Sequence, residues 1–196
     1  MNYALRGVGQ NDAHALLERA YLIPDPWKLD SEPEHFRFAE TNGHIRRVFG
    51  DEIGSLLEIG CGEGLQTEVL AGVSRSTTGI DVSPTAVNRA RRRLPGVEFA
   101  VGDLLTQPWP LDQPRFDVVV ACEVLYYLSD VPRTLDRMEQ LARRGCLVTY
   151  FSPAERRIGA YVAARQGVEK ATFSFGETQW TVAWWRRAGA PERGSA

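Results

Sequence analysis

The chain has 196 residues, of which 43% are hydrophobic and 24% are charged, a composition typical of an ordinary globular protein. Its formal net charge of −2 gives no indication of a broad electrostatic attraction to nucleic acid or to an anionic lipid surface. No apolar run approaches the roughly 18 residues that a membrane span requires, and the first residues do not form the pattern of a secretory signal. We therefore expect a cytoplasmic protein.

The cysteines and histidines argue against a disulfide framework and against a metal site. Cys61, Cys122 and Cys146 each lie singly inside an apolar stretch, without the paired spacing of metal ligands or of disulfide partners. The chain has only three histidines, so a histidine-rich metal site is not expected. We predict reduced thiols and no bound metal.

The predicted elements begin with two helical patterns that flank the turn-rich residues 23–33. Five apolar runs then predict strands at 55–60, 77–83, 97–103, 116–124 and 146–151. Helical spacing predicts helices at 65–73, 85–94, 130–144 and 155–167, with Ser83 and Pro84 starting the second and Gly145 ending the third. Residues 169–185 predict two more strands around Gly176, close enough to pair as a hairpin.

This alternation predicts an α/β fold of three layers. The sheet is expected to be seven-stranded and mostly parallel, with right-handed crossovers, helices on both faces and an antiparallel C-terminal hairpin. We interpret residues 1–196 as a single domain, in which residues 1–50 form an N-terminal helical cap and residues 51–187 the core. Residues 188–196 are expected to be a disordered tail.

The stretch "LLEIGCGEG", Leu56 to Gly64, places three glycines within five residues directly after a strand. One interpretation is a tight turn between a strand and a helix. The other is a main chain kept bare so that a ligand can lie against it. In a sheet of this kind, ligands bind in the crevice outside the carboxyl ends of the strands, which is where this loop lies.

Two acidic residues favour a ligand, because each ends one of the next two strands. Asp81 lies 17 residues beyond Gly64, and its two acceptor oxygens suit the hydroxyl pair of a ribose. Asp103 can accept the exocyclic amine of adenine, with Leu104 against the purine ring. The alternatives are a helix cap for Asp81 and a turn for Asp103.

The spacing of the glycines separates two kinds of adenosine cofactor. A dinucleotide fingerprint has glycine at its sixth position, where the helix begins beside the pyrophosphate. Here that position is Leu65, and the spacing G-x-G-x-G preceded by Glu58 suits a ligand without a pyrophosphate.

Four motifs in order resemble those of the class I S-adenosylmethionine-dependent methyltransferases. They are "LLEIGCGEG", "TGIDVS", "GDL" and "FDVVVACEVLYYL", and they span about residues 55–150. The resemblance implies a Rossmann-like methyltransferase fold and S-adenosyl-L-methionine as cofactor. It carries the cofactor-binding role to positions in each motif: Glu58, Gly60, Cys61 and Gly62 in the first, Asp81 and Val82 in the second, Asp103 and Leu104 in the third, and Cys122 in the fourth.

Within that class the chain resembles the NodS-like small N-methyltransferases. The segments "CEVLYYL" (Cys122 to Leu128) and "DPWKL" (Asp25 to Leu29) carry this second resemblance. It implies an amine acceptor on a small molecule. The chain departs from the pattern at Glu63, inside the glycine loop, and at Cys122, where serine is expected, so the acceptor of NodS itself is not transferred.

Methyl transfer needs a nucleophile held in line with the methyl group and, for an amine, a base that takes its proton. Glu123 and Tyr127, just after the fourth strand, are the candidate catalytic residues. Glu123 is expected to remove the proton of the amine or to fix its ammonium group; the alternative is that it bridges the following segment. Tyr126 and Tyr127 cannot both point inward along an extended segment, and Tyr127 is the one expected in the site.

Two residues of the N-terminal segment are candidate cofactor contacts. Arg37 can form a charge-assisted pair with the methionine carboxylate of the cofactor, and Trp27 can cover the sulfonium or the entry. The alternatives are a solvated arginine and a buried tryptophan.

The acceptor class is narrowed by what the fourth motif does not contain. It holds "ACEV" and not the [DN]-P-P-[YFW] tetrapeptide of enzymes that methylate base amines in nucleic acid. The leading hypothesis is a small-molecule methyltransferase acting on an amine, as a monomer or homodimer. The alternatives are an RNA or protein methyltransferase and a non-catalytic S-adenosylmethionine-binding domain.

Overall fold

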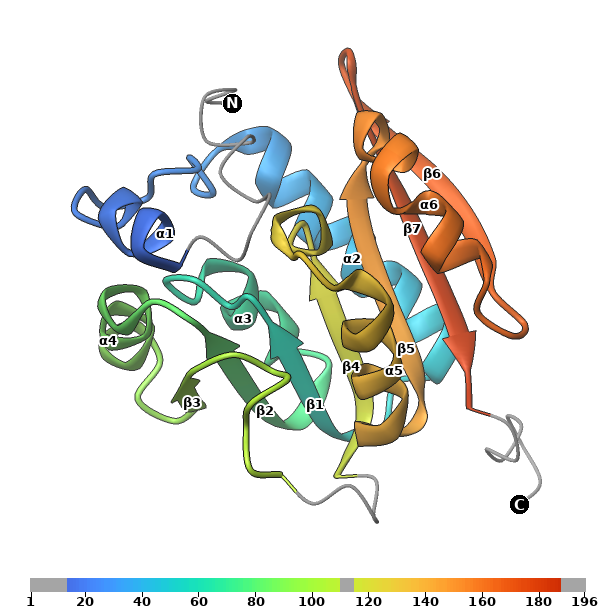
Figure 1. Ribbon diagram of the computed structural model, residues 1–196, viewed down its shortest axis with the longest axis horizontal. Helices are drawn as coiled ribbons and strands as arrows, with labels where there is room; N and C mark the ends of the chain where they lie inside the picture. The colour runs from blue at the N-terminus through green and yellow to red at the C-terminus, as the bar shows by residue number, and fades with distance from the viewer. Residues whose placement is uncertain (1–13, 110–114, 188–196) are drawn as a thin grey trace.

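Seven strands form one sheet within the described residues, 14–109 and 115–187, of the computed structural model (Figure 1). Across the sheet their order is β3-β2-β1-β4-β5-β7-β6. The first five are parallel, and β7 runs antiparallel to both β5 and β6. The strands are β1 Ile53–Ile59, β2 Ser74–Asp81, β3 Glu98–Val101, β4 Phe116–Cys122, β5 Ala142–Phe151, β6 Glu169–Phe175 and β7 Thr178–Arg186.

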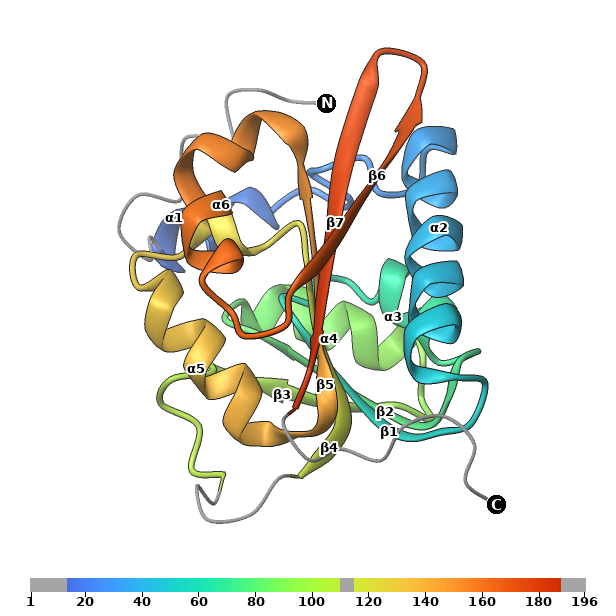
Figure 2. The same ribbon diagram turned by 90° about the vertical axis from the view of Figure 1, so that its right-hand side faces the viewer.

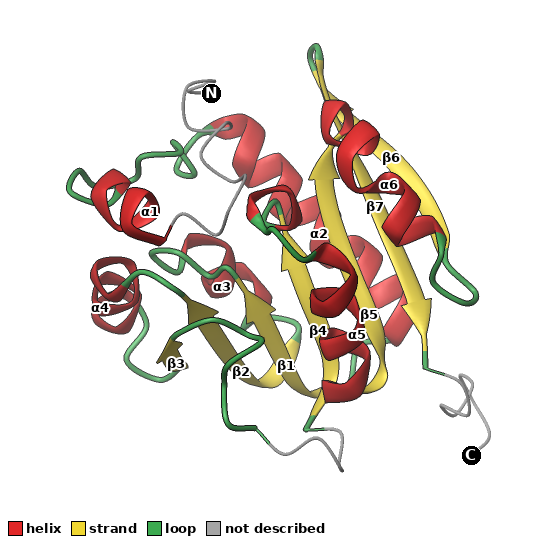
Figure 3. Cartoon of the chain, in the orientation of Figure 1, coloured by secondary structure: helices red, strands yellow, loops and turns green. Residues whose placement is uncertain are grey.

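Helices cover both faces of this sheet, which gives three layers (Figure 2). On one face lie α2 and α3, and on the other lie α5 and α6. The helices are α1 His14–Ala20, α2 Glu32–Phe49, α3 Leu65–Leu70, α4 Pro84–Arg93, α5 Val131–Leu141 and α6 Glu155–Ala163. In residues 14–109 and 115–187, none of them combines the length and the apolar character needed to cross a bilayer. The predicted fold class is confirmed, antiparallel hairpin included (Figure 3).

The order of the strands fixes where a ligand can bind. From β1 the chain moves outward to β2 and β3, then returns to place β4 on the other side of β1. The loops that leave β1 and β4 therefore diverge to opposite faces and open a crevice beyond the carboxyl ends of these strands.

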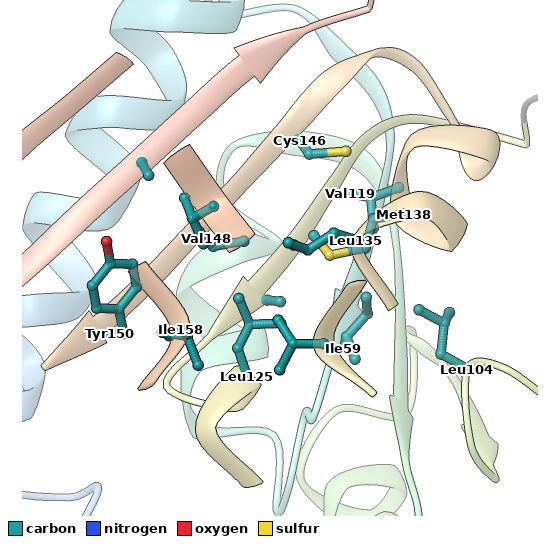
Figure 4. Close-up of a cluster of buried hydrophobic side chains, with 14 of the residues drawn as sticks. Ile59, Leu104, Val119, Leu125, Leu135, Met138, Cys146, Val148, Tyr150 and Ile158 are labelled. Atoms are coloured by element: carbon teal, nitrogen blue, oxygen red, sulfur yellow. The ribbon is translucent and has the colours of Figure 1, made fainter. Parts of the chain in front are cut away.

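Two apolar clusters hold the layers together, one on each face of the sheet. Under α5 and α6, the side chains of Leu135, Met138 and Ile158 pack on Val148 and Leu125, and all five are fully buried (Figure 4). On the opposite face a second cluster joins α2 to the strands. The continuous apolar run of β4 follows from this arrangement, since both of its faces are covered.

The starts of two helices follow the sequence signals. Ser83 accepts a hydrogen bond from the Ala86 N–H (3.0 Å) and Pro84 takes the first helical position of α4. Asp130 caps α5 in the same way, through the Arg133 N–H (3.1 Å). Each cap satisfies a backbone donor that the helix leaves without a partner.

The boundary between α5 and β5 differs from the prediction. The helix ends at Leu141, and residues 142–145 already belong to the strand, so Gly145 does not end the helix. Its role is a close approach: a side chain at Gly145 would collide with the carbonyl oxygen of Trp185 on β7. Glycine there lets two strand backbones pair, a tertiary contact that local sequence does not announce.

The N-terminal segment has two roles. Residues 14–31 lie beyond the carboxyl ends of the strands, with α1 beside α4 (Figure 1). The longer α2 packs Ile45, Val48 and Phe49 on the face of the sheet and so belongs to the helix layer, not to a cap over its end. The predicted tail, 188–196, lies outside the described residues.

Gly79 on β2 and Gly43 on α2 give a matched test of the packing. A methyl group at Gly79 would lie 2.7 Å from ring atoms of Phe99 and 2.9 Å from Cβ of Cys61, whereas at Gly43 it would meet no described atom within 4 Å. Gly79→Ala is expected to lower the free energy of unfolding by about 1–3 kcal/mol through overpacking. Gly43→Ala is expected to raise it by about 0.5–1 kcal/mol through helix propensity. Urea unfolding followed by circular dichroism measures both, and equal stability of the two variants contradicts this account of the packing.

Candidate active site

A cavity lies at the crevice between β1 and β4 and extends over the ends of β2 and β3. It brings together all thirteen residues that the sequence singled out, although they come from six separate segments of the chain. They are Trp27, Arg37, Glu58, Gly60, Cys61, Gly62, Asp81, Val82, Asp103, Leu104, Cys122, Glu123 and Tyr127.

The glycines of the loop after β1 do two different things. Gly60 and Gly62 line the cavity and have positive φ angles, 73° and 52°, that side chains rarely adopt. A side chain on Gly62 would also come within 2.8 Å of the hydroxyl oxygen of Tyr21. Gly64, also with positive φ (83°), instead packs closely on Ala90 of α4. Two glycines thus expose main chain to the cavity, and the third serves the turn.

Asp81 ties the end of β2 to this loop. Its Oδ2 accepts a hydrogen bond from the Gly62 N–H (3.0 Å), and its Oδ1 accepts one from the Ser83 N–H (2.9 Å). Burial raises the pKa of the carboxyl, and the two N–H donors counteract this. The helix cap itself is Ser83, so capping does not explain Asp81. Each carboxylate oxygen keeps acceptor capacity toward the cavity.

Asp103 and Leu104 form the next part of the wall. One carboxylate oxygen of Asp103 accepts a hydrogen bond from the Leu105 N–H (2.7 Å), which is the turn role considered above. The other lies 3.7 Å from Nε2 of His14 on α1. Leu104 is buried and offers an apolar surface to the cavity.

Arg37 is buried and not solvated, with an exposed fraction of 1%. Its Nε donates to Oε2 of Glu34 (2.7 Å) and its Nη1 donates to Oε1 of Gln66 (2.7 Å). Sequence reasoning missed both partners, which also line the cavity. The i,i+3 spacing of Glu34 and Arg37 on a helix was the available signal. The guanidinium therefore enters the cavity with a fixed orientation.

Glu58 lies below the glycine loop and is buried. Burial raises its pKa to about 7, although the Thr67 hydroxyl, which donates to its Oε2 (2.5 Å), and the charge of Arg37 oppose the shift. Near neutral pH this acid is divided between its two protonation states.

Glu123 both faces the cavity and bridges to neighbouring segments. Its Oε2 accepts hydrogen bonds from the Tyr126 hydroxyl (2.9 Å) and from the Phe151 N–H (3.1 Å). Burial raises the pKa of this carboxyl, and the charge of Arg37 opposes the shift. The two interpretations of Glu123 are thus compatible, because bridging uses only one of its oxygens.

The two tyrosines after Glu123 are not on an extended segment. Leu125–Tyr127 form a 3-10 helix, and both tyrosines line the cavity with ring centroids 4.8 Å apart. The expectation that only one could point inward is wrong, because a 3-10 helix does not alternate its side chains between two faces as a strand does.

Residues 21–27 form a roof over the cavity. Trp27 donates a hydrogen bond from Nε1 to the Tyr127 hydroxyl (3.0 Å), and its ring lies 4.8 Å from that of Tyr21. The Asp25 N–H donates to Oε2 of Glu63 (2.8 Å), and Oε1 of Glu63 pairs with Arg89 of α4. The unusual glutamate of the glycine loop therefore fastens the roof to that loop.

Two thiols also line the cavity. Burial raises the pKa of Cys122 to about 12 and moves the pKa of Cys61 well above its usual range. Both cysteines are free. They contribute uncharged surface beside the buried acids.

These features fit a nucleoside without a pyrophosphate. The bare backbone at Gly60 and Gly62, the carboxylate of Asp81 and the apolar side chain of Leu104 follow the strand ends in the order of an adenosine. A pyrophosphate belongs at the N-terminus of the helix after the loop. Here the first residue of that helix, α3, is Leu65, which holds the position that glycine takes in a dinucleotide fingerprint.

Comparison with known proteins agrees with this reading of the site. The family model described as nodulation protein S (NodS) matches residues 9–158. The nodulation protein S of Bradyrhizobium diazoefficiens is 35% identical over 153 residues, which cover 76% of this chain and 68% of the relative. That of Rhizobium tropici is 36% identical over 129 residues, and there the match spans 64% of this chain and about half (52%) of the relative.

A solved structure is similar as well. The crystal structure of the N-methyltransferase NodS from Bradyrhizobium japonicum, in complex with S-adenosyl-L-homocysteine, superposes with a TM-score of 0.71 at 25% identity. The match covers 91% of this chain and 100% of that chain. Fold and site together define a class I S-adenosylmethionine-dependent methyltransferase. Within that class, the chain belongs to the NodS family.

Asp81 and Asp117 allow a controlled test of the nucleoside site. Asp81→Asn is expected to weaken binding of S-adenosyl-L-homocysteine about 10- to 100-fold, because one acceptor oxygen for the ribose becomes a donor. In Asp117, at the opposite end of the sheet, Oδ2 accepts hydrogen bonds from the N–H groups of Gly54 (2.8 Å) and Ser55 (3.0 Å).

Asp117→Asn is therefore expected to lower stability and to leave the affinity unchanged. Isothermal titration calorimetry measures the affinity of each variant. Unaltered affinity in Asp81→Asn contradicts the assignment of the ribose to this carboxylate.

Proposed function

We propose that this chain transfers a methyl group from S-adenosyl-L-methionine to an amine nitrogen of a small molecule. The observation that carries the proposal is the half-buried Glu123, whose side chain lines the cavity beside the nucleoside site. Membership of the NodS family supports the same reaction, since the similar solved enzyme is an N-methyltransferase.

The geometry of the cavity supports an assignment of the residues that hold the cofactor. Asp81 takes the ribose hydroxyls, Asp103 the exocyclic amine of adenine, and Leu104 the face of the purine. The fixed guanidinium of Arg37 takes the methionine carboxylate as a charge-assisted pair. When bound, S-adenosyl-L-methionine supplies a methyl group on a positively charged sulfur, already activated for displacement.

Glu123 prepares the acceptor. An amine reaches the site from water mostly as its ammonium ion, which has no lone pair to attack with. A carboxylate in a desolvated cavity attracts that cation and is more basic than in water, so it accepts the proton as the amine becomes neutral. The roof of Tyr21 and Trp27 limits the water that competes for the same proton.

The two alternative functions receive less support. An RNA substrate calls for a basic surface, and the net charge of the chain is −2. A non-catalytic binding domain needs no acceptor site, whereas here the carboxylate of Glu123 and two tyrosines line the cavity beside the nucleoside site.

The cellular location and the oligomeric state of the enzyme are also proposals. We place it in the cytoplasm, which the three free, buried cysteines support. It acts as a monomer or homodimer on a small-molecule acceptor, without nucleic acid or membrane as partner.

Glu123→Gln is expected to lower kcat about 100-fold or more, because the amide cannot accept the proton. Binding of S-adenosyl-L-homocysteine is expected to stay within twofold of the unmodified protein. Glu155→Gln is the matched control, since Glu155 also accepts a tyrosine hydroxyl (Tyr150, 2.6 Å) but does not line the cavity. Purified protein, labelled cofactor and a panel of amines, amino sugars and transfer RNA give the measurement. Full turnover in Glu123→Gln would falsify the role of Glu123, and methylation of the RNA alone would replace the proposed substrate class.

The rate is expected to depend on pH through Glu123. Burial raises its pKa, and only the ionised form accepts a proton, so kcat falls as the pH drops through that raised pKa. The acidic limb of the profile is therefore expected at higher pH than for an ordinary glutamate. Steady-state rates across pH check this, and a limb that persists in Glu123→Gln assigns the titration to another group.

A further inference from the structure

The two oxygens of the Glu123 carboxylate have different surroundings. Oε2 is engaged by the Tyr126 hydroxyl and by the Phe151 N–H, at 2.9 and 3.1 Å. Oε1 is buried and has no hydrogen-bond partner within residues 14–109 and 115–187. Leaving a buried acceptor unsatisfied costs about 1–3 kcal/mol, so this oxygen is a place where the fold gives up stability.

The backbone at Glu123 is strained as well, which is a second local cost in stability at this residue. Its φ angle is 58°, in the left-handed region that a residue with a side chain avoids at a cost of about 1–2 kcal/mol. The Glu123 N–H still donates to the Thr149 carbonyl (2.9 Å), so the last rung of the β4–β5 ladder forms before the chain turns. The turn directs the carboxylate toward the neighbouring strand β5, where the Phe151 N–H meets it.

Tyr126 is held in place by its neighbours. It is buried, and its ring centroid lies 4.8 Å from that of Tyr127 and 6.3 Å from that of Phe151. Its hydroxyl therefore approaches Glu123 from a fixed direction. The adjacent Tyr127 has a separate contact, since its hydroxyl accepts the hydrogen bond from Trp27 of the roof.

We propose that Tyr126 is the positioning residue of the acceptor site, because it occupies Oε2 of Glu123 and so leaves Oε1 as the oxygen that takes the proton of the amine. The inference rests on the proposed function of Glu123. In the step itself one N–H bond of the ammonium breaks and one O–H bond forms at Oε1. The lone pair stays on nitrogen, and the carboxylate becomes a neutral acid.

Several groups face Glu123 and set the pH at which it ionises. From α2, Arg37 favours the carboxylate and Glu34 disfavours it. The Tyr126 hydroxyl favours it through its hydrogen bond to Oε2, and the Thr149 hydroxyl on β5, which lies near but forms no hydrogen bond to the carboxylate, favours it less. The thiol of Cys122 on β4 lies close by. Removing the Tyr126 hydroxyl therefore raises the pKa of Glu123, since a donor to the charged form is lost.

Tyr126→Phe in the full chain tests the proposal by two readouts. The first is the carbon-13 NMR titration of the Glu123 carboxyl with S-adenosyl-L-homocysteine bound, its resonance assigned by its loss in Glu123→Gln. The second is the pH profile of kcat. We expect the titration of Glu123 to move to higher pH, and kcat to fall about tenfold on the acidic limb and recover at alkaline pH. Affinity for S-adenosyl-L-homocysteine is expected to stay within twofold.

Tyr150→Phe is the matched control, because it removes another buried tyrosine hydroxyl that donates to a glutamate. A loss of stability common to both variants then cannot be mistaken for positioning. The control is expected to leave the Glu123 titration unchanged. Replacement of Tyr126 by 3-fluorotyrosine keeps the hydroxyl and makes it a stronger donor, so it is expected to move the titration to lower pH even if Tyr126→Phe does not fold.

The outcomes separate this proposal from the proposed function. An unchanged titration of Glu123 in both Tyr126 variants overturns the positioning role. If the titration moves as expected but the unmodified protein methylates no amine, the arrangement of Tyr126 and Glu123 stands and the proposed reaction falls.

Discussion

One hydrogen bond, from the Gly62 N–H to Oδ2 of Asp81, joins the two parts of the nucleoside site. It connects the loop after β1 to the end of β2, so the bare backbone and the carboxylate keep a fixed relation to each other. Asp81 is half-buried, and its charge is stabilised by N–H donors from the loop and from Ser83. The sheet supplies the frame for this contact, because the reversal of strand order at β1 and β4 leaves a crevice at the same edge.

The fold class and many of the residues that line the cavity could be predicted from the sequence, for a physical reason. The carboxyl ends of parallel strands meet at one edge of the sheet, so residues that end successive apolar runs become neighbours wherever the strands pair. Gly60, Asp81, Asp103 and Glu123 each follow such a run, and their place along the cavity follows from strand order. The fold class was predictable from the same alternation of strand and helix periods.

The features that could not be predicted depend on contacts between segments far apart in the chain. Nothing near Arg37 in the sequence points to its hydrogen bond with Gln66. Gly145 has the local pattern of a residue that ends a helix, and only the close approach of β7 explains why glycine is needed there. The 3-10 helix that turns Tyr126 and Tyr127 to the cavity is likewise set by how β4 ends. Local propensity yields to tertiary packing at each of these places.

The proposed reaction makes the reactivity of the two thiols in the cavity important. Cys61 and Cys122 line the space that receives an electrophilic methyl group, and the thiolate is the form of cysteine that attacks such a group. Burial raises the pKa of both, so they remain protonated and weakly nucleophilic. Desolvation in the cavity thus makes the Glu123 carboxylate more basic and makes the thiols of Cys61 and Cys122 less nucleophilic. Burial thereby lowers the tendency of both thiols to react with a methyl donor.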